Sequence, residues 1–171
     1  MSKILILGNS GSGKSTFTKK LANKLNIDYL HLDTIIYKHS WTNPEFEAME
    51  QKIQDYILKP SWIIDGNFLN KATSRFTECD TIYFLDINRF VCLFSVINRY
   101  FKFKGKKRDS RSDLCDEKLT KDYLKWVFSG FYKTSRKRIY DFIRQNPNKK
   151  VIIFNSRRQI NKYIKEELSW K

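Results

Sequence analysis

The amino-acid sequence predicts an α/β fold in which a parallel sheet is covered by helices on both faces. Three observations predict it. Short apolar runs alternate along the chain with longer stretches of helical period. The apolar runs are continuous rather than alternating, as strands buried on both faces require. Several of them end directly in a polar residue, and that edge of an open α/β sheet is where ligands bind.

The expected elements follow one another in a regular order, and no repeat or low-complexity tract interrupts them. Pro44, Pro60 and Pro147 all fall at expected element boundaries. A length of 171 residues fits one domain, 1–171. The predicted strands are 3–8, 28–32, 61–65, 81–86 and 150–154, and the predicted helices are 14–25, 44–58, a short one near 69–77, 89–103, 117–145 and 156–168, with a loop at 104–116.

The most informative segment is the octet GNSGSGKS at residues 8–15, which matches the phosphate-loop pattern G-x-x-x-x-G-K-[ST]. Glycines let backbone N–H groups close around a polyphosphate where a Cβ would collide. Lys14 supplies a charge for the β and γ phosphates, Ser15 a hydroxyl for Mg²⁺, and the next helix its positive N-terminus. The predicted triphosphate contacts are Gly8, Asn9, Ser10, Gly11, Ser12, Gly13, Lys14, Ser15 and Thr16.

The composition limits the kinds of partner that the protein can be expected to bind and the compartment in which it is expected to work. The formal net charge is +15, with basic residues concentrated in 99–111 and 133–138, which suits either a nucleic acid or an enclosed small polyanion. No apolar stretch reaches the length needed to span a bilayer, so we expect no membrane partner and a cytoplasmic protein. Cys79, Cys92 and Cys115 are widely spaced and predict packed, reduced thiols rather than a disulfide framework or a zinc site.

Three aspartates follow predicted strands, and for each of them a functional role stands beside a purely structural one. Asp65 and Asp86 both suit the second anchor of a triphosphate-bound Mg²⁺, although Asp86 also suits the N-cap of helix 89–103. Asp33 is placed to orient an acceptor hydroxyl and receive its proton, or else it is a turn residue. His31 is expected to be a packed or supporting histidine.

Phosphoryl transfer needs charge neutralised on the moving group, a task that arginines on a mobile flap often perform. We expect such a lid at about 99–136, with Arg99, Arg108, Arg111 and Arg136 as candidates for reaching the phosphates. A solvated basic face without a catalytic task is the alternative for most of these cations. Ser156 and Arg157 follow the last strand and are predicted to contact the nucleotide, as is Arg99.

Aromatic residues interleave with the basic ones and could stack on nucleobases. Phe90, Phe94, Ile97 and Phe101 follow the helical period of a buried stripe, as do Leu119, Tyr123, Trp126 and Gly130, so we expect packing rather than base stacking.

Four motifs taken in order resemble those of the bacterial DNA topology modulation protein family, which is similar to adenylate kinases. They are the phosphate loop with Thr16, His31-Leu32-Asp33, the run from Trp62 to Asn67, and the run from Asp80 to Asp86. The resemblance spans nearly the whole chain. It implies a P-loop NTPase fold of three layers, α/β/α, with a five-stranded parallel sheet in the order 2-3-1-4-5, a helical lid, and ATP with Mg²⁺ as cofactors.

The resemblance also implies roles at the acceptor side. Asp65-Gly66 matches the Asp-Gly of adenylate kinases, whose aspartate lies near the metal and whose glycine lies near the acceptor. The chain then continues with Asn67-Phe68-Leu69, whereas adenylate kinases have Phe-Pro-Arg. The arginine that holds an acceptor phosphate is therefore absent from that position, and Arg75 is the candidate replacement. The predicted substrate contacts are Asp33, Asp65, Gly66, Asn67 and Arg75.

These features predict an ATP-dependent small-molecule kinase acting on a nucleoside, a nucleotide or another hydroxyl-bearing acceptor. The alternative is a nucleic-acid-binding protein that affects DNA topology and keeps a regulatory or residual ATP site; its binding would weaken steeply with salt through counterion release. An NTP-hydrolysing switch is less well supported, because no switch segment or water-positioning Gln is recognisable. The sequence leaves both a monomer and a homodimer open.

Overall fold

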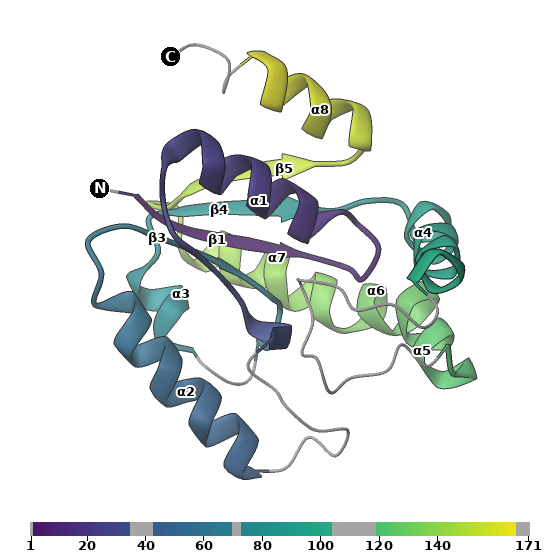
Figure 1. The fold of residues 1–171 in the computed structure, drawn as a ribbon, viewed down its shortest axis with the longest axis horizontal. Coiled ribbons are helices and arrows are strands. Elements are labelled where there is room, and N and C mark those ends of the chain that lie inside the picture. The colour runs from purple at the N-terminus through teal and green to yellow at the C-terminus, as the bar shows by residue number, and fades with distance from the viewer. Residues whose placement is uncertain (1, 35–42, 70–72, 104–118, 167–171) are drawn as a thin grey trace.

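The computed structural model describes residues 2–34, 43–69, 73–103 and 119–166, which form a five-stranded parallel sheet with helices on both faces (Figure 1). The strand order is β2-β3-β1-β4-β5, which confirms the predicted order 2-3-1-4-5. The strands are β1 (Lys3–Gly8), β2 (Tyr29–His31), β3 (Trp62–Asp65), β4 (Thr81–Leu85) and β5 (Lys150–Phe154). The α-helices are α1 (Lys14–Leu25), α2 (Asn43–Ile57), α3 (Ser74–Glu78), α4 (Arg89–Phe103), α5 (Lys121–Lys125), α6 (Phe131–Lys133), α7 (Ser135–Gln145) and α8 (Arg157–Glu166).

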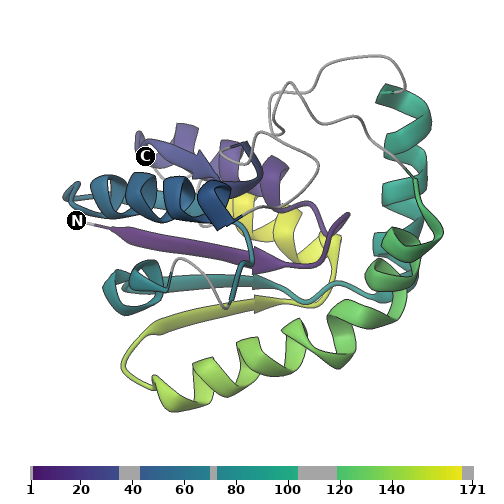
Figure 2. The ribbon, with the colours of Figure 1, turned by 90° about the horizontal axis from the view of Figure 1, so that it is seen from below.

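The strands are buried on both faces, as their continuous apolar sequences predict. Leu5 and Leu7 of β1 face the core formed with α2, α3 and α7, whereas Ile4 and Ile6 face the core formed with α1 and α8. The alternation of side chains along a strand sends neighbours to opposite faces, so an uninterrupted apolar run fills two cores at once. The result is the predicted three-layer arrangement, seen edge-on in Figure 2.

Helix α1 forms where the sequence predicts it, at residues 14–25. Phe17 and Leu21 lie one turn apart and are buried against the sheet, which fixes the face of the helix. The helix ends at Asn26, whose φ of 53° is left-handed and whose N–H donates to the carbonyl of Ala22. Asparagine is one of the few residues that tolerates this conformation at a helix end.

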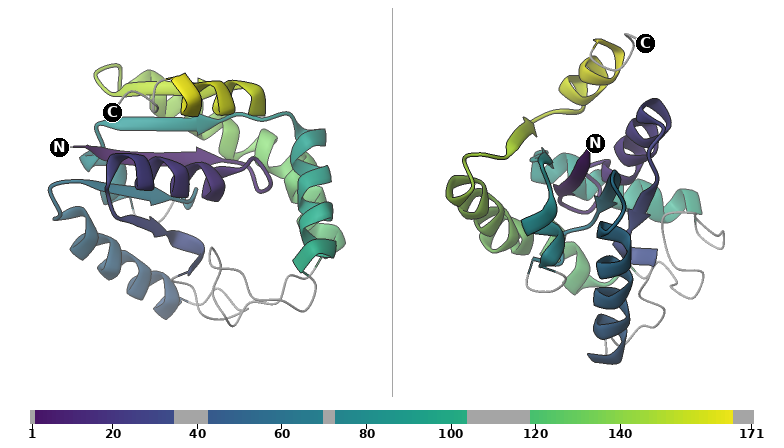
Figure 3. Two further views of the ribbon diagram at one scale, coloured as in Figure 1. Left: turned by 45° about the horizontal axis from the view of Figure 1, so that its top comes forward. Right: turned by 90° about the vertical axis from the view of Figure 1, so that its left-hand side faces the viewer.

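Helix α4 stands across the carboxyl ends of the strands (Figures 2 and 3), and the face that it buries is not the predicted one. Phe90, Phe94 and Phe101 are 65%, 65% and 69% exposed, so the expectation of a buried stripe is wrong. Cys92 and Val96 are buried instead. The helical period shows that residues share a face, but only the neighbouring loop decides which face is covered.

The predicted single helix at 117–145 is also wrong within the described part of the chain. After α5 the backbone makes a π-helical turn, η2 (Trp126–Gly130), and a further break at Thr134 separates α6 from α7. Gly130 suits the π turn, because a Cβ there would lie 2.9 Å from the Trp126 ring. A π turn inside a helix is an irregularity that often accompanies functional sites.

Other differences are small. The strand predicted at 28–32 ends at His31 and continues as a 3-10 turn, η1 (Leu32–Thr34), and the short helix expected near 69–77 is Ser74–Glu78. Cys79 and Cys92 are buried free thiols, as predicted, while Cys115 and the loop 104–116 lie outside the described residues. Within the described ranges, no helix combines the length and apolar character that crossing a membrane requires.

Candidate active site

The phosphate loop joins β1 to α1 in the conformation that its glycines allow. Gly11 has a φ of 77°, and a Cβ there would lie 2.3 Å from the carbonyl oxygen of Cys92 in α4. Gly13 has a φ of 100° and precedes the first residue of α1, with nothing within 4 Å of its Cβ position. The loop is therefore pressed against α4 at Gly11 and open at Gly13, next to the helix N-terminus where an anion binds.

The polar groups of the loop are arranged for an anion. The Lys14 ammonium donates to the carbonyl oxygen of Asn9 at 3.1 Å, which keeps it folded over the loop. The Ser12 hydroxyl is buried and has no hydrogen-bond partner among the described residues. A buried hydroxyl without a partner is costly, and a phosphate oxygen would supply that partner.

Asn67, two residues after the end of β3, binds the backbone at the start of the phosphate loop. Its side-chain oxygen accepts from the Gly8 N–H at 3.1 Å, and its side-chain NH₂ donates to the Gly8 carbonyl at 2.8 Å. Both functions of the amide are thus engaged with the backbone of Gly8. This arrangement favours a role in shaping the loop over the predicted contact with substrate.

Asp65 ends β3 and lies between β1 and β2, in register with Ile6 and His31. One of its carboxylate oxygens is 2.8 Å from His31 Nδ1, and both side chains are buried. His31 is therefore the packed, supporting histidine that the sequence predicts. The other oxygen, Oδ1, is buried without a hydrogen-bond partner among the described residues.

The donor set at this edge fits a Mg²⁺ ion that arrives with a triphosphate. No cluster of three or more acidic, His or Cys ligands occurs in the described part of the chain. Mg²⁺ bound to a nucleotide needs few protein ligands, because phosphate oxygens and waters fill most positions. The Ser15 hydroxyl at the start of α1 and the orphaned Oδ1 of Asp65 are the matching groups.

The predicted acceptor residues lie beside one another. Asp33 is exposed in the turn η1 that follows β2, directly after the buried Leu32. Gly66 packs so closely on Leu32 that a Cβ would approach that side chain to 2.8 Å. The two segments predicted to meet the acceptor, Asp33 and Asp65-Gly66, therefore share one corner of the sheet edge.

Arg75 is buried and is not exposed at this corner of the sheet edge. Its side chain is fully buried, and its guanidinium donates to the carbonyl oxygen of Asn67 at 2.6 Å and to that of Gly66 at 3.5 Å. Burial lowers the pKa of Arg75 to about 9, so the group remains charged at neutral pH. Its position favours holding the turn at 66–68 over binding an acceptor phosphate.

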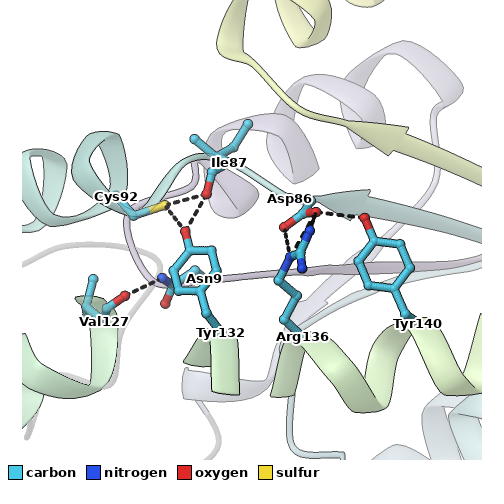
Figure 4. Close-up of polar contacts among 8 residues, drawn as sticks. All are labelled: Asn9, Asp86, Ile87, Cys92, Val127, Tyr132, Arg136 and Tyr140. Atoms are coloured by element: carbon cyan, nitrogen blue, oxygen red, sulfur yellow. Dashed lines mark hydrogen bonds and ion pairs between the residues drawn. The ribbon is translucent and has the colours of Figure 1, made fainter. Parts of the chain in front are cut away.

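Asp86 does not cap α4, so that interpretation was wrong. Asn88 performs the task, since its side-chain oxygen accepts from the N–H of Phe90 at 2.9 Å. The Asp86 carboxylate instead accepts from Arg136 Nε at 2.8 Å and from the Tyr140 hydroxyl at 2.7 Å (Figure 4). Burial and the adjacent Asp86 raise the pKa of Tyr140, so its hydroxyl stays protonated and donates.

The remaining predicted nucleotide contacts lie in α4 and at the start of α8. Arg157, the first residue of α8, donates to the carbonyl oxygen of Gly11 at 2.9 Å and to the Ser95 hydroxyl. Ser156 precedes it and accepts from the N–H of Gln159 as a helix cap. Arg99 donates to the Tyr123 hydroxyl at 3.1 Å. Arg108 and Arg111 lie outside the described residues.

Two further contacts of this region leave no signal in the sequence that could have predicted them. The Asn9 side-chain NH₂ donates to the carbonyl oxygen of Val127 in the π turn at 2.7 Å, and Asn9 is only 1% exposed. The Tyr132 hydroxyl donates to the carbonyl oxygen of Ile87, just after β4 (Figure 4). Neither contact joins residues that are near in sequence.

Comparisons with known proteins agree on the fold. No protein-family model matches the sequence, and no curated protein matches it either. Shikimate kinase from Bacteroides thetaiotaomicron superposes with a TM-score of 0.60 at 16% identity, over 98% of this chain and 97% of that one. Deoxyadenosine kinase from M. mycoides superposes with a TM-score of 0.52 at 15% identity, over 98% and 99% of the two chains.

These similarities establish the P-loop α/β fold, which the sequence predicts. They do not show membership of the DNA topology modulation family, to which the sequence motifs have a resemblance. At such identities a likeness concerns the fold alone, because unrelated activities share superfolds.

Proposed function

We propose that the chain is an ATP-dependent phosphotransferase that moves the γ-phosphoryl group from Mg·ATP to a hydroxyl of a small acceptor. The observation that carries the proposal is the phosphate loop, with the Lys14 ammonium folded over it and a buried Ser12 hydroxyl that has no hydrogen-bond partner among the described residues. The similarity of the fold to two kinases supports it. A nucleoside, a nucleotide and another hydroxylated metabolite are all acceptors of the proposed class.

On the donor side, the loop amides and Lys14 hold the β and γ phosphates, and Lys14 exchanges the Asn9 carbonyl for the anion. Arg157 and Ser156 adjoin the loop at the start of α8, where they are proposed to contact the nucleotide together with Arg99. Ser15 and Asp65 would hold Mg²⁺, whose charge offsets that of the triphosphate.

On the acceptor side, Asp33 orients the hydroxyl and receives its proton as the oxygen attacks the γ phosphorus. The bond between that phosphorus and the β–γ bridging oxygen breaks, and ADP leaves with the electron pair. The absence of a side chain at Gly66 lets Leu32 pack against it, which keeps Asp33 and Asp65 at the same corner of the sheet edge. Catalysis of this kind is mainly positioning and charge stabilisation.

The lid, about 99–136 within a single domain 1–171, is proposed to supply further positive charge. Arg136 lies at the carboxyl end of β4, where it is bonded to Asp86 and half-exposed. It would reach the transferring group by giving up part of that pair. Arg108 and Arg111 are proposed for the same task, and the need for ATP places the activity in the cytoplasm.

The test is an ADP-release assay with Mg·ATP across nucleosides, nucleoside monophosphates and small hydroxylated metabolites. We expect one class to stimulate release and Lys14→Ala to abolish it. Lys20→Ala is the matched control, because it removes the same charge from the exposed face of the same helix. ATP binding without stimulation by any acceptor would refute the phosphotransferase proposal.

A further inference from the structure

Three hydrogen-bonded contacts hold the segment from α5 to α7 against the carboxyl edge of the sheet. Asp86 binds Arg136 and Tyr140, the Ile87 carbonyl accepts from Tyr132, and Asn9 donates to Val127 (Figure 4). The first two contacts come from the end of β4. The third comes from the phosphate loop itself, across 118 residues of sequence.

The Asn9–Val127 contact is well defined chemically. A carbonyl oxygen only accepts, so the NH₂ of the Asn9 amide must be the group that faces it. Both residues are buried, and the donor–acceptor distance is 2.7 Å. A carbonyl has two lone pairs, so the Val127 oxygen can accept from Asn9 in addition to any bond within the π turn.

The backbone of the same asparagine is connected to the nucleotide-binding lysine. The Asn9 carbonyl oxygen accepts from Lys14 Nζ at 3.1 Å and from the Ser12 N–H at 3.2 Å. A triphosphate in the loop would draw the Lys14 ammonium away, because a charged acceptor outcompetes a neutral carbonyl. Asn9 therefore makes two separate contacts. Its backbone carbonyl binds Lys14, the group that responds to the nucleotide, and its side chain binds the π turn.

We propose that Asn9 is a positioning residue that couples occupancy of the triphosphate site to the packing of the segment Trp126–Lys133. The inference rests on the proposed function, because it requires a nucleotide in the loop. Phosphate contacts to the loop amides would fix the Asn9 backbone and so strengthen its hold on Val127. Bound nucleotide then tightens a helical segment that, within the described part of the chain, the backbone hydrogen bonds of the loop do not reach.

Hydrogen–deuterium exchange of the Trp126–Lys133 amides, measured with and without Mg·ADP, tests the coupling. In the wild type we expect Mg·ADP to slow exchange there about fivefold, as one hydrogen bond of ordinary net strength implies. Asn9→Leu keeps most of the side-chain volume and removes the donor, and Asn9→Ala serves if the leucine variant does not fold. Exchange of both variants is measured at a Mg·ADP concentration that titration shows to be saturating, and both should show no slowing.

The matched control is Tyr140→Phe, which removes one of the β4 contacts that hold the segment from α5 to α7 and touches no residue of the loop among the contacts described. It should exchange faster in both states yet keep the slowing by Mg·ADP. Loss of the slowing in both Tyr140→Phe and the Asn9 variants would mean a merely structural role and overturn the proposal. A wild type that binds Mg·ADP without slowing would overturn the coupling alone, whereas failure to bind would refute the proposed function and the coupling with it.

Discussion

Two glycines of the phosphate loop should respond differently to the same substitution. Gly13 is fixed by the phosphate-loop pattern, whereas Gly11 occupies one of its variable positions. Sequence alone therefore predicts that Gly13→Ala is the more damaging change. In the structure a Cβ at Gly11 would meet the Cys92 carbonyl at 2.3 Å, while a Cβ at Gly13 meets nothing within 4 Å.

The magnitudes follow from these contacts. Both substitutions force alanine into a positive φ, which costs about 1–2 kcal/mol. Gly11→Ala adds overpacking against a backbone atom that cannot rotate away, for about 1–3 kcal/mol more. In a domain of this size each kcal/mol lowers the melting temperature by about 2–4 °C. Taking about 3 kcal/mol for Gly11→Ala predicts a loss of roughly 6–12 °C, against roughly 2–8 °C for Gly13→Ala.

Thermal unfolding and Mg·ATP titration of the two variants separate stability from binding. Gly13→Ala should lose more nucleotide affinity than stability, since the open space at its Cβ position is where the anion approaches the helix N-terminus. Gly11→Ala should lose mainly stability. A Gly13→Ala variant that melts at or below the temperature of Gly11→Ala would refute the close approach of the loop to α4.

Three shorter predictions concern the rest of the site. Asp33→Asn should abolish acceptor-dependent ADP release and leave ATP affinity nearly unchanged; a large loss of affinity in the same titration would assign Asp33 to the donor side. Asp86→Ala should lower the free energy of unfolding, measured with urea, by about 2–3 kcal/mol. This is less than the full cost of breaking a buried ion pair, because Arg136 is half-exposed and its guanidinium can turn to water. An unchanged urea midpoint would contradict the ion pair between Asp86 and Arg136. Burial raises the pKa of Cys79 from 9.0 to about 11, so the native thiol stays protonated at pH 9. Alkylation of Cys79 at pH 9 should therefore be slow until the protein unfolds. Stability should also be lost as the pH rises from 9 to 11, because the thiol of the unfolded chain ionises first.

The sequence alone determined the elements whose signal is local. The phosphate loop, the buried strands and helix α1 depend on residue types a few positions apart, and all of these elements lie where they were predicted. The aspartates at the strand ends follow from the same logic, because parallel strands present their carboxyl ends at one edge. The strand order 2-3-1-4-5 came from the motif resemblance, and the structure confirms it.

Only the tertiary structure decided which groups meet across long separations. It turned Phe90 and Phe94 of α4 outward, paired Asp86 with a guanidinium 50 residues away, and joined Asn9 to the π turn. A helical period fixes which side chains share a face, but the neighbour that covers a face is supplied by distant chain. A carboxylate's partner is likewise set by packing rather than by spacing. For this reason the position of the phosphate loop could be predicted from the sequence, whereas the contacts that hold its surroundings in place could not.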